Sequence, residues 1–225
     1  MIISDDTLKV LQNFASVNPN LVLKPGQKVK TISEAKNIMA SADIIEDFPV
    51  EFGVYDLSEF LSVHGLIENP NVEFDDKSLT ISNGDQTVKY YYAETEILTQ
   101  PTKDITMPEA EVGISLSESI LDQIKRAASV LGHMELSLKG ENGVVTASVL
   151  DIKDATANTF DVVVDRDNNC KESFDFVVNI PNLKLLPGDY FVSISSKLIS
   201  SWQNTNYPVE YFIALERTSS YGVKI

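Results

Sequence analysis

Cysteine, histidine and long apolar runs are scarce in this chain, and each scarcity excludes a class of protein. The single cysteine, Cys170, allows no disulfide within the chain and is typical of a reducing compartment. The two histidines, His64 and His133, lie far apart and have no metal-ligand partner at short spacing. No apolar run approaches the ~20 residues that cross a bilayer, and the first residues lack the basic and apolar segments of a signal peptide. We therefore expect a soluble intracellular protein.

Basic residues are also few. The chain has 18 Lys and Arg against 33 Asp and Glu, which gives a formal charge of -15. This charge argues against a protein that nucleic acid wraps externally, because such a surface is usually basic. It still allows contact with DNA through a small basic surface. The 43% hydrophobic content can fill a core, and 225 residues suffice for one large domain or two ordinary ones.

Motifs of common enzymes are missing as well. The sequence contains no G-x-S-x-G, no phosphate-binding loop and no dinucleotide fingerprint. Asp165-x-Asp167-x-Asn169 begins like a calcium loop. However, Cys170 stands where that loop needs glycine, and Phe176 stands where it needs a bidentate glutamate. We therefore expect no enzyme, no bound metal and no cofactor.

The most informative pattern that is present runs from residue 173 to residue 190. It predicts a buried strand at Phe174–Val178, a helix cap at Asn179, and a short helix that begins at Pro181 and ends at Pro187. This helix is predicted to expose Lys184 and to bury the three leucines Leu183, Leu185 and Leu186.

A similar strand–cap–helix unit stands earlier in the chain. Its strand is predicted at Phe52–Tyr55 and its cap at Asp56, and the inner helical face comprises Leu57, Phe60 and Leu61. The chain therefore contains the same local plan twice.

Two longer amphipathic helices precede these units. The helix predicted at Asp5–Val17 has an apolar side and places Lys9 on the other side. The helix predicted at Ser117–Leu131 begins with Ser117 as its cap and places Lys125 and Arg126 opposite its apolar side. The inward residues are predicted to be Leu8, Leu11, Phe14 and Ala15 in the first helix, and Ile120, Leu121, Ile124, Ala128 and Leu131 in the second.

Short strands account for most of the remaining chain. Residues 94–113 lose periodicity and contain two prolines, so they are predicted to link residues 1–93 to residues 114–225. A loop is predicted around Trp202–Tyr207. Strands are predicted at Leu21–Leu23, Val29–Ile32, Ala35–Ile45 (where a helix is the alternative), Asn71–Phe74, Ser78–Ile81, Gln86–Ala93, Met134–Leu138, Val144–Leu150, Thr159–Val164, Tyr190–Ser195 and Val209–Arg217. The sequence thus predicts an α+β fold with two similar domains, each with helices on one face of antiparallel sheets.

Four groups of segments carry a family resemblance, and their order covers nearly the full chain. They are Leu11–Ala15, then Val54–Leu57 with Phe60 and Leu61, then Phe174–Asn179 with Pro187–Tyr190, and finally Tyr211–Glu216. Together they resemble the DNA polymerase sliding clamp of T-even-type bacteriophages.

The resemblance implies a homotrimeric ring of similar clamp domains, with helices around a central hole and sheets as the outer wall. Such a ring slides on duplex DNA without sequence specificity and confers processivity on the viral replicative DNA polymerase, which docks by a C-terminal peptide. An ATP-driven clamp loader opens the ring, and some members also link to late viral transcription. The resemblance implies no enzymatic activity, and it places the protein in the cytoplasm of an infected bacterial host.

The same resemblance suggests three sets of functional residues. The predicted DNA-facing residues are Lys9, Lys125, Arg126 and Lys184, for which a solvated helix surface is the alternative. The predicted partner-peptide site comprises Ile97, Leu98, Tyr207, Pro208, Val209, Tyr221 and Val223, although Ile97 and Leu98 could instead pin the linker. The predicted subunit interface comprises Val88, Tyr90, Tyr92, Asp161, Val162 and Val164, with ordinary pairing inside a domain as the alternative.

A second function competes with the clamp. An acidic, strand-rich chain without catalytic motifs also suits a trimeric viral structural or adaptor protein. Such an adaptor needs no basic outward face on its helices, so these faces discriminate between the two functions.

Overall fold

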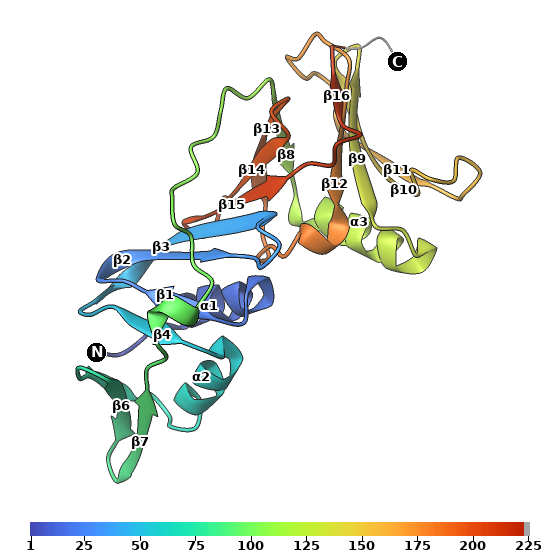
Figure 1. Ribbon diagram of the computed structural model, residues 1–225. Helices are drawn as coiled ribbons and strands as arrows, with labels where there is room; N and C mark the ends of the chain where they lie inside the picture. Colours follow the sequence, from blue (N-terminus) through green and yellow to red (C-terminus); the bar gives the residue numbers. More distant parts are fainter. Residues whose placement is uncertain (223–225) are drawn as a thin grey trace. The chain divides into compact units, whose positions relative to one another are not determined.

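The computed structural model describes residues 1–222, and the chain divides into two compact units, Met1–Asp104 (unit 1) and Ile105–Ile225 (unit 2) (Figure 1). In the described residues, no helix is both long and apolar enough to cross a membrane. Unit 1 contains α1 (Asp5–Val17), β1 (Leu21–Leu23), β2 (Gly26–Ile32), β3 (Ile38–Phe48), β4 (Phe52–Val54), α2 (Leu57–His64), β5 (Asn71–Phe74), β6 (Ser78–Asn83), β7 (Gln86–Tyr91) and the 3-10 turn η1 (Thr95–Ile97).

Helix α1 has the predicted bounds, but its buried side is rotated from the predicted one. The Ser4 hydroxyl caps it by accepting from the Thr7 N–H at 3.3 Å. The buried residues are Thr7, Val10, Leu11, Phe14 and Val17. Leu8 and Ala15 are only half-buried, so the prediction that they face the core is wrong. Both line a groove of about 420 Å³ whose other wall is α2, because α1 packs against α2 as well as β3.

A buried carboxylate ties the start of α1 to β3. Glu46 accepts from the Ser4 N–H at 2.6 Å and from the Thr7 hydroxyl. Burial alone would raise the pKa of Glu46, but these hydrogen bonds outweigh burial and lower it. The acid therefore stays charged at the positive end of the helix dipole, where an anion is stabilising.

The strands of unit 1 form antiparallel pairs. β1 pairs with β4, β2 pairs with β3, and β5, β6 and β7 form a meander. The predicted strand at Ala35–Ile45 is confirmed in type, because β3 occupies Ile38–Phe48 and alternates buried and exposed residues. A cluster of four aromatic rings joins these strands: Phe48, Phe52, Phe74 and Tyr92, with centroids 5.0–6.0 Å apart.

Helix α2 follows β4 as the sequence predicts. The Asp56 carboxylate accepts from the Glu59 N–H at 3.0 Å and caps the helix. Leu57 and Phe60 are buried, whereas the predicted inward residue Leu61 is only half-buried. His64 is buried, and desolvation lowers its pKa. Burial at the end of α2 therefore disfavours the charged form of its imidazole.

Gly53 holds the chain after β7 close to β4. A Cβ at this position would lie 2.5 Å from the Ala93 carbonyl oxygen and 2.8 Å from Leu98 Cδ1. The Ala93 N–H also donates to the Gly53 carbonyl at 2.9 Å. Leu98 is therefore packed against β4 through a contact that only glycine permits.

Unit 2 repeats the plan of a capped helix on antiparallel strands. In α3 the Ser117 hydroxyl accepts from the Ile120 N–H at 3.4 Å, and Gly132 ends the helix in the left-handed region. Leu121, Ile124 and Ala128 are buried against β10 and β11, whereas Ile120 and Leu131, which were also predicted to face inward, are only half-buried. The elements are β8 (Val112–Leu116), α3 (Glu118–Leu131), β9 (Glu135–Glu141), β10 (Val144–Leu150), β11 (Phe160–Asp165), β12 (Phe174–Asn179), the 3-10 turn η2 (Ile180–Asn182), β13 (Tyr190–Ser195), β14 (Ile199–Asn204), β15 (Val209–Ala214) and β16 (Ser220–Tyr221).

Two antiparallel arrangements build unit 2. One sheet has the order β11-β10-β9-β12-β16. In the other, β13 pairs with both β8 and β14, and β14 pairs with β15. Strand β8 begins inside the predicted linker, and Val112, Ile114 and Leu116 alternate inward.

The predicted helix after β12 is wrong. Only the single turn η2 forms, and Asn179 makes no side-chain cap. The three predicted leucines are nevertheless buried. They lie in an irregular segment, which can be buried because two tyrosine hydroxyls satisfy its backbone hydrogen-bonding groups. The Leu186 N–H donates to the Tyr211 hydroxyl at 3.2 Å, and the Tyr190 hydroxyl donates to the Leu186 carbonyl at 2.6 Å.

The predicted loop around Trp202–Tyr207 is wrong at its start. Trp202 lies in β14, opposite Val192 and Tyr211, and is fully buried. Its ring N–H donates to the Ser200 hydroxyl at 2.9 Å. The tryptophan is therefore a core residue of a central strand.

Candidate functional site

The predicted DNA-facing residues differ in exposure and in the partners of their side chains. Lys9 is exposed on α1 and pairs with Asp6 at 3.1 Å. Lys125 and Arg126 are both exposed and adjacent on α3. Partial desolvation lowers the pKa of Lys125, and the charge of Asp122 opposes this shift. The Arg126 Nε–H donates to the Asp122 carbonyl at 3.3 Å, which fixes the guanidinium against the helix.

Lys184 differs from the other three predicted cations because it is not on a helix. It follows η2 and is half-buried between Leu183 and Leu185, which are both buried. The sequence argument that placed it on an outward helical face is wrong, since that helix is only one turn long.

Acidic residues also stand on the helices, mainly at their beginnings. Asp5 and Asp6 lie in the first turn of α1, Glu59 in that of α2 and Glu118 in that of α3. These positions are stabilised by the helix dipole. The cationic character of the helices is consequently concentrated in the second half of α3, at Lys125 and Arg126.

The predicted interface residues lie on two edge strands, except Tyr92, which directly follows the last residue of β7. β7 ends the meander β5-β6-β7, and β11 ends the sheet β11-β10-β9-β12-β16. Each strand thus pairs inside its own unit on one side and, within residues 1–222, has no hydrogen-bonded strand on the other, although β11 lies near β8. The predicted residues are mostly half-buried: Val88, Tyr90, Tyr92, Val162 and Val164, with Asp161 exposed.

Each edge strand has one face toward a helix. Tyr90 on β7 packs edge-on against Phe60 of α2, with ring centroids 5.3 Å apart. Burial first, and then the charges of Glu59 and Asp56, raise the pKa of Tyr90. Burial also raises the pKa of Tyr92. On β11, Phe160 lies on the side that contacts α3.

The predicted partner-peptide residues differ in exposure. Ile97 is 70% exposed, whereas Leu98 is buried, which agrees with the alternative that Leu98 pins its segment. Pro208 is exposed and Tyr207 half-buried, while Val209 is buried in β15. Tyr221 is half-buried and stacks on Phe176 at 6.3 Å. Val223 lies outside the described residues.

One exposed apolar site was not predicted from the sequence. Val130 on α3 is 83% exposed and lines a hollow of about 450 Å³ together with Phe160 of β11. The sequence signal for this site was Val130, an apolar residue outside the predicted inward positions of an amphipathic helix. This hollow extends the apolar surface beside the β11 edge.

Comparison with known proteins identifies the class of this fold. The structure superposes on A. fulgidus PCNA, solved with the C-terminal region of FEN-1 bound, with a TM-score of 0.72 at 13% identity; the match covers 97% of this chain and 98% of that one. At this identity the likeness shows the fold alone, and the fold is that of the DNA clamps.

The sequence comparisons are more specific. A profile of the family described as DNA polymerase processivity factor matches residues 4–99. The sliding clamp of Vibrio phage KVP40 is 32% identical over 222 residues, which cover 96% of this chain and 99% of that protein. The sliding clamp of Enterobacteria phage T4 is 25% identical, with 98% and 99% covered. The chain belongs to the sliding-clamp family of phage DNA polymerase processivity factors. The predicted fold class and the predicted function are confirmed.

Proposed function

We propose that three copies of this clamp close into a ring around duplex DNA. Residues 1–93 and 114–225 would be its two clamp domains, with residues 94–113 as the linker. The observation that supports ring closure most strongly is the pair of open edge strands, β7 and β11, at the ends of two different sheets. Edge-to-edge pairing between neighbouring copies would satisfy both edges, which otherwise invite uncontrolled association.

The side chains of these strands are complementary in both polarity and charge. Val88 and Tyr90 on the inner face of β7 would continue the inner face of β11, which carries Phe160 and Val162. On the opposite face, β7 presents the exposed Lys89 and β11 presents the exposed Asp161. Opposite charges across paired strands are stabilising, so the proposed contact joins apolar to apolar and cation to anion.

Reversing one of these charges should loosen the ring. Lys89→Glu would replace an attraction by a repulsion worth about 1 kcal/mol at each interface. Because a trimer has three such interfaces, the trimer association constant should fall by about a hundredfold. Analytical ultracentrifugation over a range of protein concentrations measures this shift.

Two variants make the test specific. Lys77→Glu changes the same charge at an exposed position next to β6 and should leave the association unchanged. Adding Asp161→Lys to Lys89→Glu should recover part of the lost affinity. If Lys89→Glu and Lys77→Glu sediment alike, β7 does not form the interface.

The proposed ring acts on DNA as a non-catalytic tether. Cations on the helices, chiefly Lys125 and Arg126, would make weak contacts to phosphates, and such contacts carry no sequence information. Weak contacts suit a ring that must slide. The acidic character of the rest of the chain, whose total formal charge is -15, would keep DNA away from other surfaces.

The proposed partners are those of a phage replication clamp in the cytoplasm of the infected bacterial host. The viral DNA polymerase would dock through its C-terminal peptide, an ATP-driven clamp loader would open the ring, and late transcription factors would form a further class of partner. For the peptide, we assign the exposed Pro208 and the half-buried Tyr207 of unit 2 as contacts. Apolar residues at a protein surface are typical of such sites.

Pro208→Glu should weaken binding of the polymerase C-terminal peptide at least tenfold, or about 1.4 kcal/mol. The carboxylate would be desolvated without a partner when the peptide covers it. Isothermal titration calorimetry with the synthetic peptide measures the loss. Ile152→Glu is the matched control, since Ile152 is 41% exposed in another loop of unit 2. Equal affinity of the two variants would remove Pro208 from the site.

A further inference from the structure

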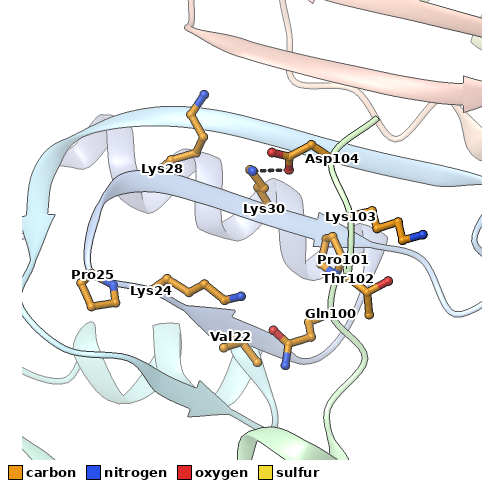
Figure 2. A pocket seen from close by; sticks show the side chains of 10 residues that line it. All are labelled: Val22, Lys24, Pro25, Lys28, Lys30, Gln100, Pro101, Thr102, Lys103 and Asp104. Atoms are coloured by element: carbon orange, nitrogen blue, oxygen red, sulfur yellow. Dashed lines mark hydrogen bonds and ion pairs between the residues drawn. The ribbon is translucent and has the colours of Figure 1, made fainter. Parts of the chain in front are cut away.

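Unit 1 contains a second concave surface, which none of the predicted sites includes. It is a cavity of about 330 Å³ between the turn that joins β1 to β2 and the extended segment of residues 100–104 (Figure 2). Four lysines line it: Lys24, Lys28, Lys30 and Lys103. They are four of only 18 basic residues in a chain with a formal charge of -15, so this "lysine pocket" is a marked local excess of positive charge.

The alternation of β2 explains why the lysines gather there. Val29 and Thr31 are buried, and α1 packs on the β2–β3 pair. Successive side chains of a strand point to opposite faces, so Lys28 and Lys30 emerge on the face opposite α1. Lys24 precedes the strand and extends toward the 100–104 segment (Figure 2).

Only part of this charge is neutralised by the protein itself. Lys28 pairs with Asp43 at 3.2 Å, and Lys30 pairs with Asp104. Among residues 1–222, no ion pair involves Lys24 or Lys103. The pocket therefore keeps an excess of positive charge after its internal ion pairs are formed.

The Asp104 carboxylate shows how an anion interacts with these lysines. Its hydrogen bond to Lys30 and the charges of Lys30, Lys28 and Lys24 lower its pKa. Its side chain is 74% exposed, and the ion pair is on the surface. Surface ion pairs contribute little to stability, so an external carboxylate can compete with Asp104 for Lys30.

We propose that the lysine pocket is a docking site for an acidic, extended peptide segment of a partner protein. Carboxylates of the peptide would pair with Lys24, Lys28 and Lys30. An apolar side chain between them would rest on Pro25 and Pro101, which line the same cavity. The segment 100–104 already crosses β2 in an extended form with one carboxylate on the lysines, which is the binding mode expected of the partner (Figure 2).

The geometry favours a peptide over duplex DNA. The cavity has the volume of a few side chains, and Val22, Pro25 and Pro101 add apolar surface between its polar residues. A duplex instead needs a broad cationic surface that follows its phosphates. The lysines also lie on the face of β2 opposite α1, and the proposed DNA contacts are on helices. Binding of a duplex through these lysines is thus the outcome that competes with peptide binding.

The test uses the full chain and a fluorescent eight-residue peptide of Asp and Glu with one central Leu. Fluorescence anisotropy should show saturable binding that weakens at least tenfold in the double variant Lys24→Gln/Lys28→Gln. The control Lys36→Gln/Lys77→Gln removes two exposed lysines of the same unit outside the pocket and should bind like the unchanged protein. Far-UV circular dichroism confirms that both variants fold.

Asp104→Asn provides the complementary test. If Asp104 occupies the site, removing its charge should increase peptide affinity several-fold, and Asp85→Asn, at an exposed turn of unit 1, should not. The proposal is overturned if the peptide does not bind at millimolar concentration, if pocket and control variants lose equal affinity, or if a 20-base-pair duplex depends on Lys24 and Lys28 as strongly as the peptide does. None of these results would affect ring formation, which depends on other strands.

Discussion

Replacing both Lys125 and Arg126 by glutamate should reduce retention of the loaded clamp on circular DNA at least tenfold, with the trimer intact. These two residues are adjacent and exposed on α3, where the cationic character of the helices is concentrated. Removing two cations and adding two anions per chain changes many phosphate contacts in a trimer at once. Affinity for DNA falls steeply as the number of neutralised phosphates decreases, so the effect should be large.

The measurement is the amount of clamp that stays with nicked circular DNA during gel filtration after loading with ATP and the clamp loader. Retention of the unchanged protein should decrease between about 50 and about 200 mM salt, and the double variant should show a smaller decrease.

A charge-matched variant separates local from global electrostatics. Lys171→Glu/Lys197→Glu makes the same change in net charge at two exposed loop positions of unit 2. It should retain DNA like the unchanged protein. If both double variants lose retention equally, net charge alone explains the effect, and if neither does, α3 does not face DNA. Sedimentation of each variant checks that the trimer persists.

The sequence predicted those parts of the fold that short-range chemistry determines. Ser117 and Asp56 cap their helices because a side-chain oxygen and an N–H three residues later are enough to make the bond. The 3.6-residue period correctly placed Leu121, Ile124 and Ala128 inward. The same period gave the exposed positions of Lys125 and Arg126, so this part of the candidate site was accessible from sequence.

The remainder depends on contacts between distant segments. The helix expected after Asn179 is a single turn because tyrosine hydroxyls from β13 and β15 satisfy the backbone at Leu186. Leu8 lies in the groove between α1 and α2 and not in the core, because α2 packs beside α1. The lysine pocket combines β2 with residues about 70 positions later, and Lys30 meets Asp104 only in the folded chain. No periodic pattern along the sequence encodes such contacts between distant residues.

Trp202 is the residue whose predicted position differs most clearly from its position in the fold. Its truncation also has the largest expected effect on stability. The sequence suggests a loop because serine, asparagine and proline surround the tryptophan. In the fold, the backbone pairs on both sides with β13 and β15, and the ring is fully buried near Tyr190, with centroids 6.4 Å apart. Burial of the largest side chain in the middle of three strands makes this site sensitive to truncation.

Trp202→Ala should lower the free energy of unfolding by about 3–5 kcal/mol, since it leaves a large cavity and strips the Ser200 hydroxyl of its donor. Trp202→Phe keeps most of the volume and should cost less. Gln203→Ala, at the exposed neighbouring position, should change stability by less than about 0.5 kcal/mol. Urea unfolding followed by far-UV circular dichroism at one fixed protein concentration measures all three, because association also contributes to the apparent stability. A loss for Trp202→Ala no larger than that for Gln203→Ala would mean that β14 is not part of the core.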